Sequence, residues 1–239
     1  MFEYAFLLKE CLIPIFIIAV ASYLVGCINT SLIVTKLLKL GNNIPSNDIR
    51  NLGSGNAGFT NVLRTAGKKL AIFTFIGDFA KGVLAVWFGK WFISFYLGTP
   101  FGNNDSVIQY GAYLAGFMCI LGHIYPCFFK FKGGKGVLTT WAMTLLLDWR
   151  VFLIIIVVFL IALLIAKIAS LSSLIAAISY PITTFLILYF TDYKTNQNFY
   201  SILFPIIISL IISAIIIYKH KSNISRILKG TENKISIHK

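Results

Sequence analysis

A polar, glycine-rich stretch at residues 53–64 interrupts a chain in which 58% of the residues are hydrophobic. Gly53, Gly55 and Gly58 allow the backbone to curl, because glycine has no Cβ to penalise a positive φ. A curled backbone can aim several N–H groups at one anion, and a guanidinium matches the geometry of phosphate. The stretch therefore predicts a phosphate-binding site. The polar side chains that it would contribute are Ser54, Asn56, Thr60, Asn61 and Arg64.

A second candidate lies at residues 122–137, where His123 and Pro126 precede two lysines on a flexible backbone. Pro126 should end the helix before it, because proline has no N–H donor. A helix is expected to begin directly after the lysines, and its N-terminus favours phosphate or acyl phosphate. The alternative is a glycine hinge whose lysines snorkel to lipid head groups. The residues expected to bind are Lys132, Gly133, Gly134, Lys135 and Gly136.

The third candidate is the stretch 220–234, in which His220, Asn223 and Arg226 recur every three residues. That spacing places them on one face of a helix, where they would complete a polar site. The alternative is an ordinary basic tail that binds anionic lipid.

Two further groups of polar residues fall at or within apolar stretches. Asp78 and Lys81 have a spacing that allows an ion pair on one helix face; charges inside a membrane span are costly, so the pair is either functional or structural. Ser170, Ser172 and Ser173 begin another apolar stretch. We expect these three serines, Ser170 among them as a candidate binding residue, either to cap a helix or to contact a substrate.

The four cysteines form no C-x-x-C pair, and each lies in or beside an apolar segment. Small buried hydrophobic side chains are therefore their expected role. Histidine and acidic residues nowhere show the spacing of metal ligands, so neither a metal nor another cofactor is expected. The cysteines are Cys11, Cys27, Cys119 and Cys127.

Charged residues make up only 12% of the chain, against about 25% in soluble domains. This composition predicts an all-α polytopic membrane protein, a bundle of seven transmembrane helices that forms one domain over residues 1–239. Because the N-terminus is not basic, we expect the first span to be retained rather than cleaved as a signal. The fourth span is short and either begins in the preceding loop or is re-entrant. The expected spans are 11–38, 69–89, 107–128, 137–147, 151–166, 171–191 and 200–218.

Lysine and arginine are concentrated on one side of these spans, 15 against four. The richer side is expected in the cytoplasm, which places the N-terminus outside, the C-terminus inside and all three polar stretches at the cytoplasmic face. The net charge of +13 then indicates anionic lipid or substrate rather than nucleic acid. The richer side holds Lys39, Arg50, Arg64, Lys68, Lys69, Lys130, Lys132, Lys135, Lys167, Lys219, Lys221, Arg226, Lys229, Lys234 and Lys239, and the other side holds Lys9, Lys90, Arg150 and Lys194.

With these three stretches in view, the chain resembles the PlsY family of bacterial membrane acyltransferases, from about residue 26 to residue 234. The order and spacing of the stretches carry the resemblance, and residues 78–82 also match the family pattern. Two positions depart from it. Near the end of the first span, where the family tends to have Gly-Ser-Ile-Pro, this chain has Gly26-Cys27-Ile28-Asn29, and Phe59 replaces an alanine.

The resemblance implies an enzyme of the cell membrane that transfers a fatty acyl group from acyl phosphate to the 1-hydroxyl of sn-glycerol 3-phosphate. The products would be 1-acyl-glycerol 3-phosphate (lysophosphatidic acid) and phosphate, the first acylation of phospholipid biosynthesis. Its partners would be these two substrates and membrane lipid, with no nucleic acid, and a monomer is the simplest form. Site residues implied are Ser54, Asn56, Asn61, Arg64, Lys132, Lys135, His220, Asn223 and Arg226.

The main demands of such a reaction are alignment and stabilisation of the developing oxyanion, because acyl phosphate already has a good leaving group. His123, His220 or a substrate phosphate oxygen could take the hydroxyl proton; a structural hydrogen bond is the expected role of His123. The His-x-x-x-x-Asp signature of other glycerolipid acyltransferases is absent. A transporter of phosphate or an organic phosphate is the alternative function, and it predicts polar residues along a path through the bilayer.

Overall fold

The computed structural model describes residues 2–37, 48–98, 106–193 and 199–235. Within these ranges the chain forms helices and connecting turns without a strand, which confirms the predicted all-α class. Lys39, Lys194 and Lys239, which entered the charge count, lie outside the described residues. The chain divides into two compact units between Leu147 and Asp148, and each unit is described by itself.

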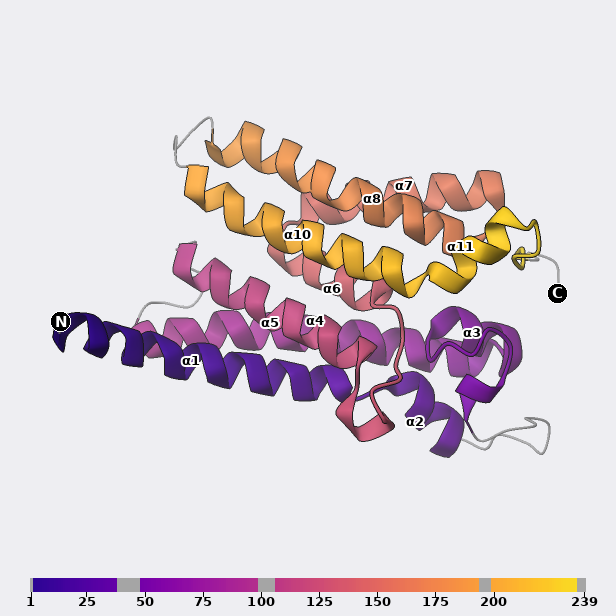
Figure 1. Ribbon diagram of the computed structural model, residues 1–239, viewed down its shortest axis with the longest axis horizontal. Coiled ribbons are helices and arrows are strands. Elements are labelled where there is room, and N and C mark those ends of the chain that lie inside the picture. Colours follow the sequence, from indigo (N-terminus) through magenta and orange to yellow (C-terminus); the bar gives the residue numbers. More distant parts are fainter. Residues whose placement is uncertain (1, 38–47, 99–105, 194–198, 236–239) are drawn as a thin grey trace. The chain divides into compact units, whose positions relative to one another are not determined.

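In the first unit, α1 packs along α5, α5 packs against α4, and α4 also packs against α6 (Figure 1). The short helices α2 and α3 both contact α4. The elements are α1 (Phe2–Cys27), α2 (Thr30–Leu37), η1 (Ile49–Asn51), α3 (Phe59–Thr65), α4 (Lys68–Leu97), α5 (Ser106–Ile124), η2 (Cys127–Phe129) and α6 (Val137–Leu147).

The first predicted span is broken, and the expectation of one continuous helix over residues 11–38 is wrong at Ile28 and Asn29. The Asn29 side chain causes the break by acting as a helix cap: its Oδ1 accepts from the Leu32 N–H at 3.2 Å and from the Ser31 hydroxyl at 2.7 Å. In a continuous helix that N–H would donate to the Ile28 carbonyl. The carbonyl instead accepts from Lys81 Nζ at 2.8 Å.

Helix α4 continues eight residues beyond the predicted end at Gly89. Lys90, which we placed in an external loop, lies inside the helix, and its Nζ donates to the Leu146 carbonyl at 2.9 Å. That carbonyl belongs to the last turn of α6, where a cation is favoured by the helix dipole. Lys90 was therefore misassigned because a helix-capping lysine and a loop lysine look alike in sequence.

In the second unit, α7 and α10 both pack against α8 (Figure 1). Asp148 caps α7 by accepting from the Arg150 N–H at 2.9 Å. The expected serine cap of α8 is wrong, because Ser172 and Ser173 donate back to the carbonyls of Ile168 and Ala169. The elements are α7 (Trp149–Ala166), α8 (Ala169–Leu188), the π-helical η3 (Tyr189–Tyr193), α10 (Phe199–Lys219) and α11 (Lys221–Leu228).

Among the described residues, six helical segments are long and apolar enough to cross a membrane: 12–37, 68–97, 106–129, 149–166, 169–191 and 202–219. Helix α6 begins and ends where predicted but has only 11 residues. At 1.5 Å per residue it is about 16 Å long, roughly half the thickness of the hydrocarbon layer.

Candidate active site

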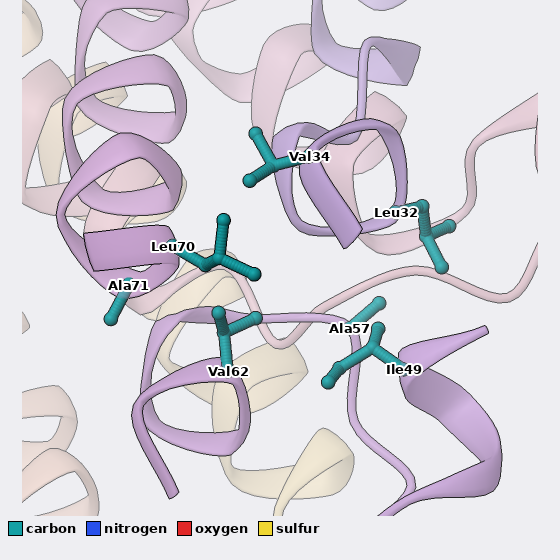
Figure 2. Close-up of a cluster of buried hydrophobic side chains, with 7 residues drawn as sticks. All are labelled: Leu32, Val34, Ile49, Ala57, Val62, Leu70 and Ala71. Carbon is teal, nitrogen blue, oxygen red and sulfur yellow. The ribbon is translucent and has the colours of Figure 1, made fainter. Parts of the chain in front are cut away.

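The segment at residues 53–64 rests on a small apolar core of the first unit (Figure 2). Ala57 and Val62 from this segment are fully buried, and they pack with residues from α2, η1 and the first turn of α4. The polar residues of the segment are therefore held by buried apolar neighbours on both sides. The core consists of Leu32, Val34, Ile49, Ala57, Val62, Leu70 and Ala71.

The backbone of this segment curls as predicted, with φ of +55° at Gly53 and +71° at Gly55. Three of the amides in this stretch already have hydrogen-bond partners in or next to it. The N–H groups of Ser54 and Gly55 donate to Asn61 Oδ1 and to the Leu52 carbonyl, and that of Gly58 donates to the Asn56 carbonyl. These internal hydrogen bonds close the curl and use three of the N–H groups that an anion nest would need.

Asn61 is the residue that holds the curl. It is 1% exposed, its Nδ2 donates to the carbonyls of Ile49 and Leu52, and its Oδ1 accepts from the Ser54 N–H at 2.9 Å. These three contacts fix the loop from both sides. The side chains of Ser54, Asn56 and Thr60 are half-buried, and Arg64 is exposed in the last turn of α3.

The second segment begins where α5 ends at Ile124, two residues before Pro126, as predicted. The chain then folds back on the end of that helix: the N–H groups of Gly133 and Gly134 donate to the carbonyls of Ile124 and His123, each at 3.1 Å. Gly136 follows with a φ of +85°, and α6 starts at the next residue. Lys132 is exposed and Lys135 is half-buried at this return.

The two polar segments meet at Gly134. A Cβ atom there would overlap the His123 ring at Nε2, and it would lie 2.8 Å from the carbonyl oxygen of Ala57 in the first segment. Gly134 is buried, so only a residue without a side chain fits between them. The structure thus brings residues 53–64 and 132–136 together, as the sequence analysis expected.

Arg50 joins the same two segments and was missed as a site residue. Its Nη1 donates to the carbonyls of Phe129 at 2.9 Å and Lys132 at 3.1 Å, while its Nε and Nη2 donate to Asp48. This hydrogen-bonded pair raises the pKa of Arg50 and lowers that of Asp48. The sequence offered the Asp-x-Arg spacing just before the glycines, but Arg50 was counted only among the cations of the loop.

Asp78 and Lys81 form the predicted ion pair, with 2.8 Å between Nζ and Oδ1. Lys81 Nζ also lies 2.9 Å from His123 Nδ1, and all three side chains are buried. An ammonium can only donate, so His123 Nδ1 offers its lone pair and the ring proton sits on Nε2, facing Gly134. A hydrogen bond was the expected role of His123; Lys81 lies against its Nδ1, and Asp78 Oδ1 is 3.6 Å from the same atom.

In the second unit, Glu232 gathers three of the predicted site residues. Its Oε1 accepts from Ser170 at 2.9 Å and Asn223 at 2.8 Å, and its Oε2 accepts from Arg226 at 2.6 Å. Burial opposes the charge of this carboxylate, but these hydrogen bonds outweigh it and lower the pKa of Glu232. Glu232 was missed because it lies in a polar tail where a single acidic residue carries no periodic signal.

His220 precedes α11 and is 2% exposed. Its Nδ1 lies 2.8 Å from the Ile216 carbonyl, which can only accept, so Nδ1 carries the proton. In the neutral ring the lone pair is then on Nε2. Of these two histidines, His220 therefore has its lone pair on Nε2 and His123 has its lone pair on Nδ1.

Within the side chains that the structure describes, no three His, Cys, Asp or Glu residues are grouped closely enough to hold a metal ion.

Comparison with known proteins gives one consistent family. The family model described as glycerol-3-phosphate acyltransferase matches residues 16–230. A glycerol-3-phosphate acyltransferase of Bartonella henselae is 40% identical over 219 residues, which cover 92% of this chain and 90% of that protein. The corresponding protein of Thermoanaerobacter sp. (strain X514) is 37% identical over 217 residues, with 91% and 93% covered.

The fold is also similar to solved structures. A crystal structure of PlsY, an integral membrane glycerol 3-phosphate acyltransferase, in its glycerol 3-phosphate form gives a TM-score of 0.72 at 32% sequence identity, covering 93% of this chain and 96% of that one. The lysophosphatidic acid form of PlsY gives a TM-score of 0.69 at 32% identity, covering 93% and 95%.

Proposed function

Because the chain belongs to the glycerol-3-phosphate acyltransferase family, we propose that it transfers a fatty acyl group from acyl phosphate to the 1-hydroxyl of sn-glycerol 3-phosphate. The hydroxyl oxygen attacks the acyl carbonyl carbon, the bond from that carbon to the phosphate oxygen breaks, and a base takes the hydroxyl proton. The products are 1-acyl-glycerol 3-phosphate and inorganic phosphate. One observation carries the proposal: two polar segments, each with cationic side chains, meet at Gly134.

Both substrates are phosphorylated, and the first unit supplies groups suited to phosphate. Arg64, Lys132 and Lys135 provide positive charge, and Ser54, Asn56 and Thr60 provide short polar side chains on the first of the two segments. We assign phosphate contact to these six. Asn61, Gly53, Gly55, Gly133, Gly134 and Gly136 shape the two segments and position the contacts.

In the second unit we assign base catalysis to His220 and orientation of a substrate oxygen to Asn223. Arg226 and Ser170 act by holding Glu232, which also accepts from Asn223. His220 is preferred to His123 because the Ile216 carbonyl leaves its lone pair on Nε2, whereas the lone pair of His123 faces Lys81.

The two histidines can be compared with matched asparagine variants. In His220→Asn the amide N–H₂ can still donate to the Ile216 carbonyl, and in His123→Asn the amide oxygen can still accept from Lys81. We expect His220→Asn to lower kcat by about 10²- to 10⁴-fold, the usual contribution of a general base. His123→Asn should keep kcat within about tenfold of wild type. Near-normal turnover in both variants would rule out a histidine base and leave a substrate phosphate oxygen in that role.

The reaction itself is tested with purified protein in detergent. Acyl phosphate with glycerol 3-phosphate should give equal amounts of phosphate and a lysophospholipid, and acyl-CoA with the same acceptor is the control for the donor. If the lysophospholipid forms with acyl-CoA as donor but not with acyl phosphate, the assigned donor is contradicted. Uptake of glycerol 3-phosphate or phosphate into vesicles without any acylated product would instead support the transporter.

We further propose that α6 is the seventh span, that residues 1–239 act as one domain in the cell membrane, and that the polar segments face the cytoplasm. The charge asymmetry counted from the sequence supports this orientation, and it grows from 15 against four to 15 against three when Lys90, which lies inside α4, is left out. Epitope tags at the two ends of the chain test it in intact cells. The N-terminal tag should be reached by an external protease and the C-terminal tag should be protected; equal protection of both tags would contradict seven spans.

A further inference from the structure

Two cysteine thiols from distant parts of the chain lie side by side in the first unit. Cys27 Sγ is 3.6 Å from Cys127 Sγ, and it also accepts from the Cys127 N–H at 3.4 Å. Cys27 ends α1 and is fully buried, whereas Cys127 begins η2 and is half-buried. The role of small buried hydrophobe, expected for every cysteine, does not account for this pairing.

Close backbone packing between α1 and α5 holds the two thiols together. A Cβ atom at Gly26 would overlap the Cys119 carbonyl oxygen, and one at Gly122 would overlap the Tyr23 carbonyl oxygen. Three residues after Gly122, the Tyr125 carbonyl accepts from the Tyr23 hydroxyl at 2.7 Å. The residues that flank both cysteines are therefore fixed, and the thiol contact follows from the packing of the helices.

We propose that Cys27 and Cys127 form a dithiol site that takes low-molecular-weight disulfides and closes to an intramolecular disulfide. The Cys127 thiolate attacks one sulfur of the small disulfide, whose S–S bond breaks and releases one thiol. The Cys27 thiolate then attacks the Cys127 sulfur, breaks the mixed disulfide and releases the second thiol. Two protein thiols are oxidised, one small disulfide is reduced to two thiols, and the two protons pass to the released thiolates.

The geometry suits a reversible bond. Closing the bridge requires the sulfur atoms to approach by about 1.5 Å, from contact to the bond length of about 2.05 Å. In a reducing compartment such a pair is held open, and oxidised small thiols close it transiently. When closed, the bridge ties the end of α1 covalently to η2, three residues before the segment 132–136. This proposal rests on the thiol geometry and is independent of the proposed acyl transfer.

The test uses the full-length protein in detergent with Cys11→Ser, so that the remaining thiols are the three whose side chains the structure describes. The protein is treated with oxidised glutathione, then denatured so that all remaining thiols are alkylated, and peptides are mapped without reduction. We expect a Cys27–Cys127 disulfide with no glutathione retained, and alkylated Cys119. Cys119 is the internal control because it is fully buried and its thiol lies near the Lys81 carbonyl.

Two single variants separate the steps. In Cys27→Ser the mixed disulfide at Cys127 should persist, because the resolving thiol is missing. In Cys127→Ser, Cys27 should stay reduced, because it is buried. Retention of glutathione at Cys127 when Cys27 is present would overturn the proposal, as would free thiols at both positions after treatment or a bridge to Cys119. Serine is close in size to cysteine, and the outcome with both cysteines present decides the matter even if a variant fails to fold.

Discussion

Replacing Gly134 with alanine tests the contact on which the candidate site depends. The added Cβ would overlap His123 at Nε2 and lie 2.7 Å from its Cε1 and 2.8 Å from the Ala57 carbonyl oxygen. Cβ atoms in proteins keep at least 3.0 Å from non-bonded heavy atoms. The backbone itself does not oppose alanine, since Gly134 is not among the residues with positive φ. The effect of the substitution is therefore steric.

The size of the effect follows from that overlap. His123 or the 132–136 segment must move by about 1 Å to admit the methyl group. Misplacing a reacting group by 1 Å costs about 10²-fold in rate, and overpacking a tight site destabilises by about 1–3 kcal/mol. Lys81 resists movement of the ring, because it is bound to His123 Nδ1 and paired with Asp78. We expect the segment to give way, and kcat/KM for glycerol 3-phosphate to fall by about 10²-fold.

The assay is phosphate release from acyl phosphate in the presence of glycerol 3-phosphate, with thermal unfolding in detergent as a second measurement. Gly98→Ala is the matched control: its φ is +63°, but a Cβ there meets no atom within 4 Å. That variant should lose about 1–2 kcal/mol of stability and keep its turnover. Wild-type kinetics in Gly134→Ala would refute the claim that the two polar segments meet there.

Three further outcomes are expected. Arg50→Lys loses the forked contacts that join the two segments, so KM for glycerol 3-phosphate should rise about tenfold with little change in kcat; an unchanged KM would contradict the bridging role. The lowered pKa of Glu232 stabilises the fold fully above its ordinary value of 4.5, and this stabilisation disappears as the pH falls through the lower folded value; Glu232→Gln should remove that part of the acid dependence of Tm. Lys90→Met loses the bond to Leu146, and Tm should fall by about 2–4 °C at unchanged turnover.

Hydrophobic runs predicted most of the helices, because a span must be long and apolar whatever lies beside it. Helix ends were predictable where the cause is local, as with Pro126, and α6 was predicted with its observed bounds. The break at Asn29 and the extension of α4 past Lys90 were not. Asn29 competes for a backbone N–H group, and Lys90 has a partner that is distant in sequence. Hydrophobic periodicity carries no information about either kind of contact.

In the candidate site, too, some features were predictable from the sequence and others were not. Glycines and cations marked the two segments of the first unit, but the partners that hold them did not stand out: Arg50 lies before the glycines and acts through distant carbonyls. Asn61, which was predicted to bind phosphate, accepts from the Ser54 N–H and so holds the loop. Residue types thus predicted which segments carry the polar site. Only the fold distinguishes the residues that can contact a ligand from the residues that hold the loops in place.

The buried charges of Asp78 and Lys81 explain how an apolar bundle can support that site. Burying an ion pair is costly, and removing one partner strands the other. Here the ammonium also satisfies the Ile28 carbonyl, released by the break between α1 and α2, and the Nδ1 atom of His123. A single charged group therefore connects the helix break, α4 and α5.

Through His123 the same group reaches Gly134 and the second polar segment. An apolar side chain in place of Lys81 would leave the Ile28 carbonyl and His123 Nδ1 without this donor, inside a region where water cannot replace it. Lys81 thus fixes the tautomer and the position of the His123 ring on which the segment 132–136 rests. The contacts by which Lys81 stabilises the bundle are thus the same contacts by which it supports the site.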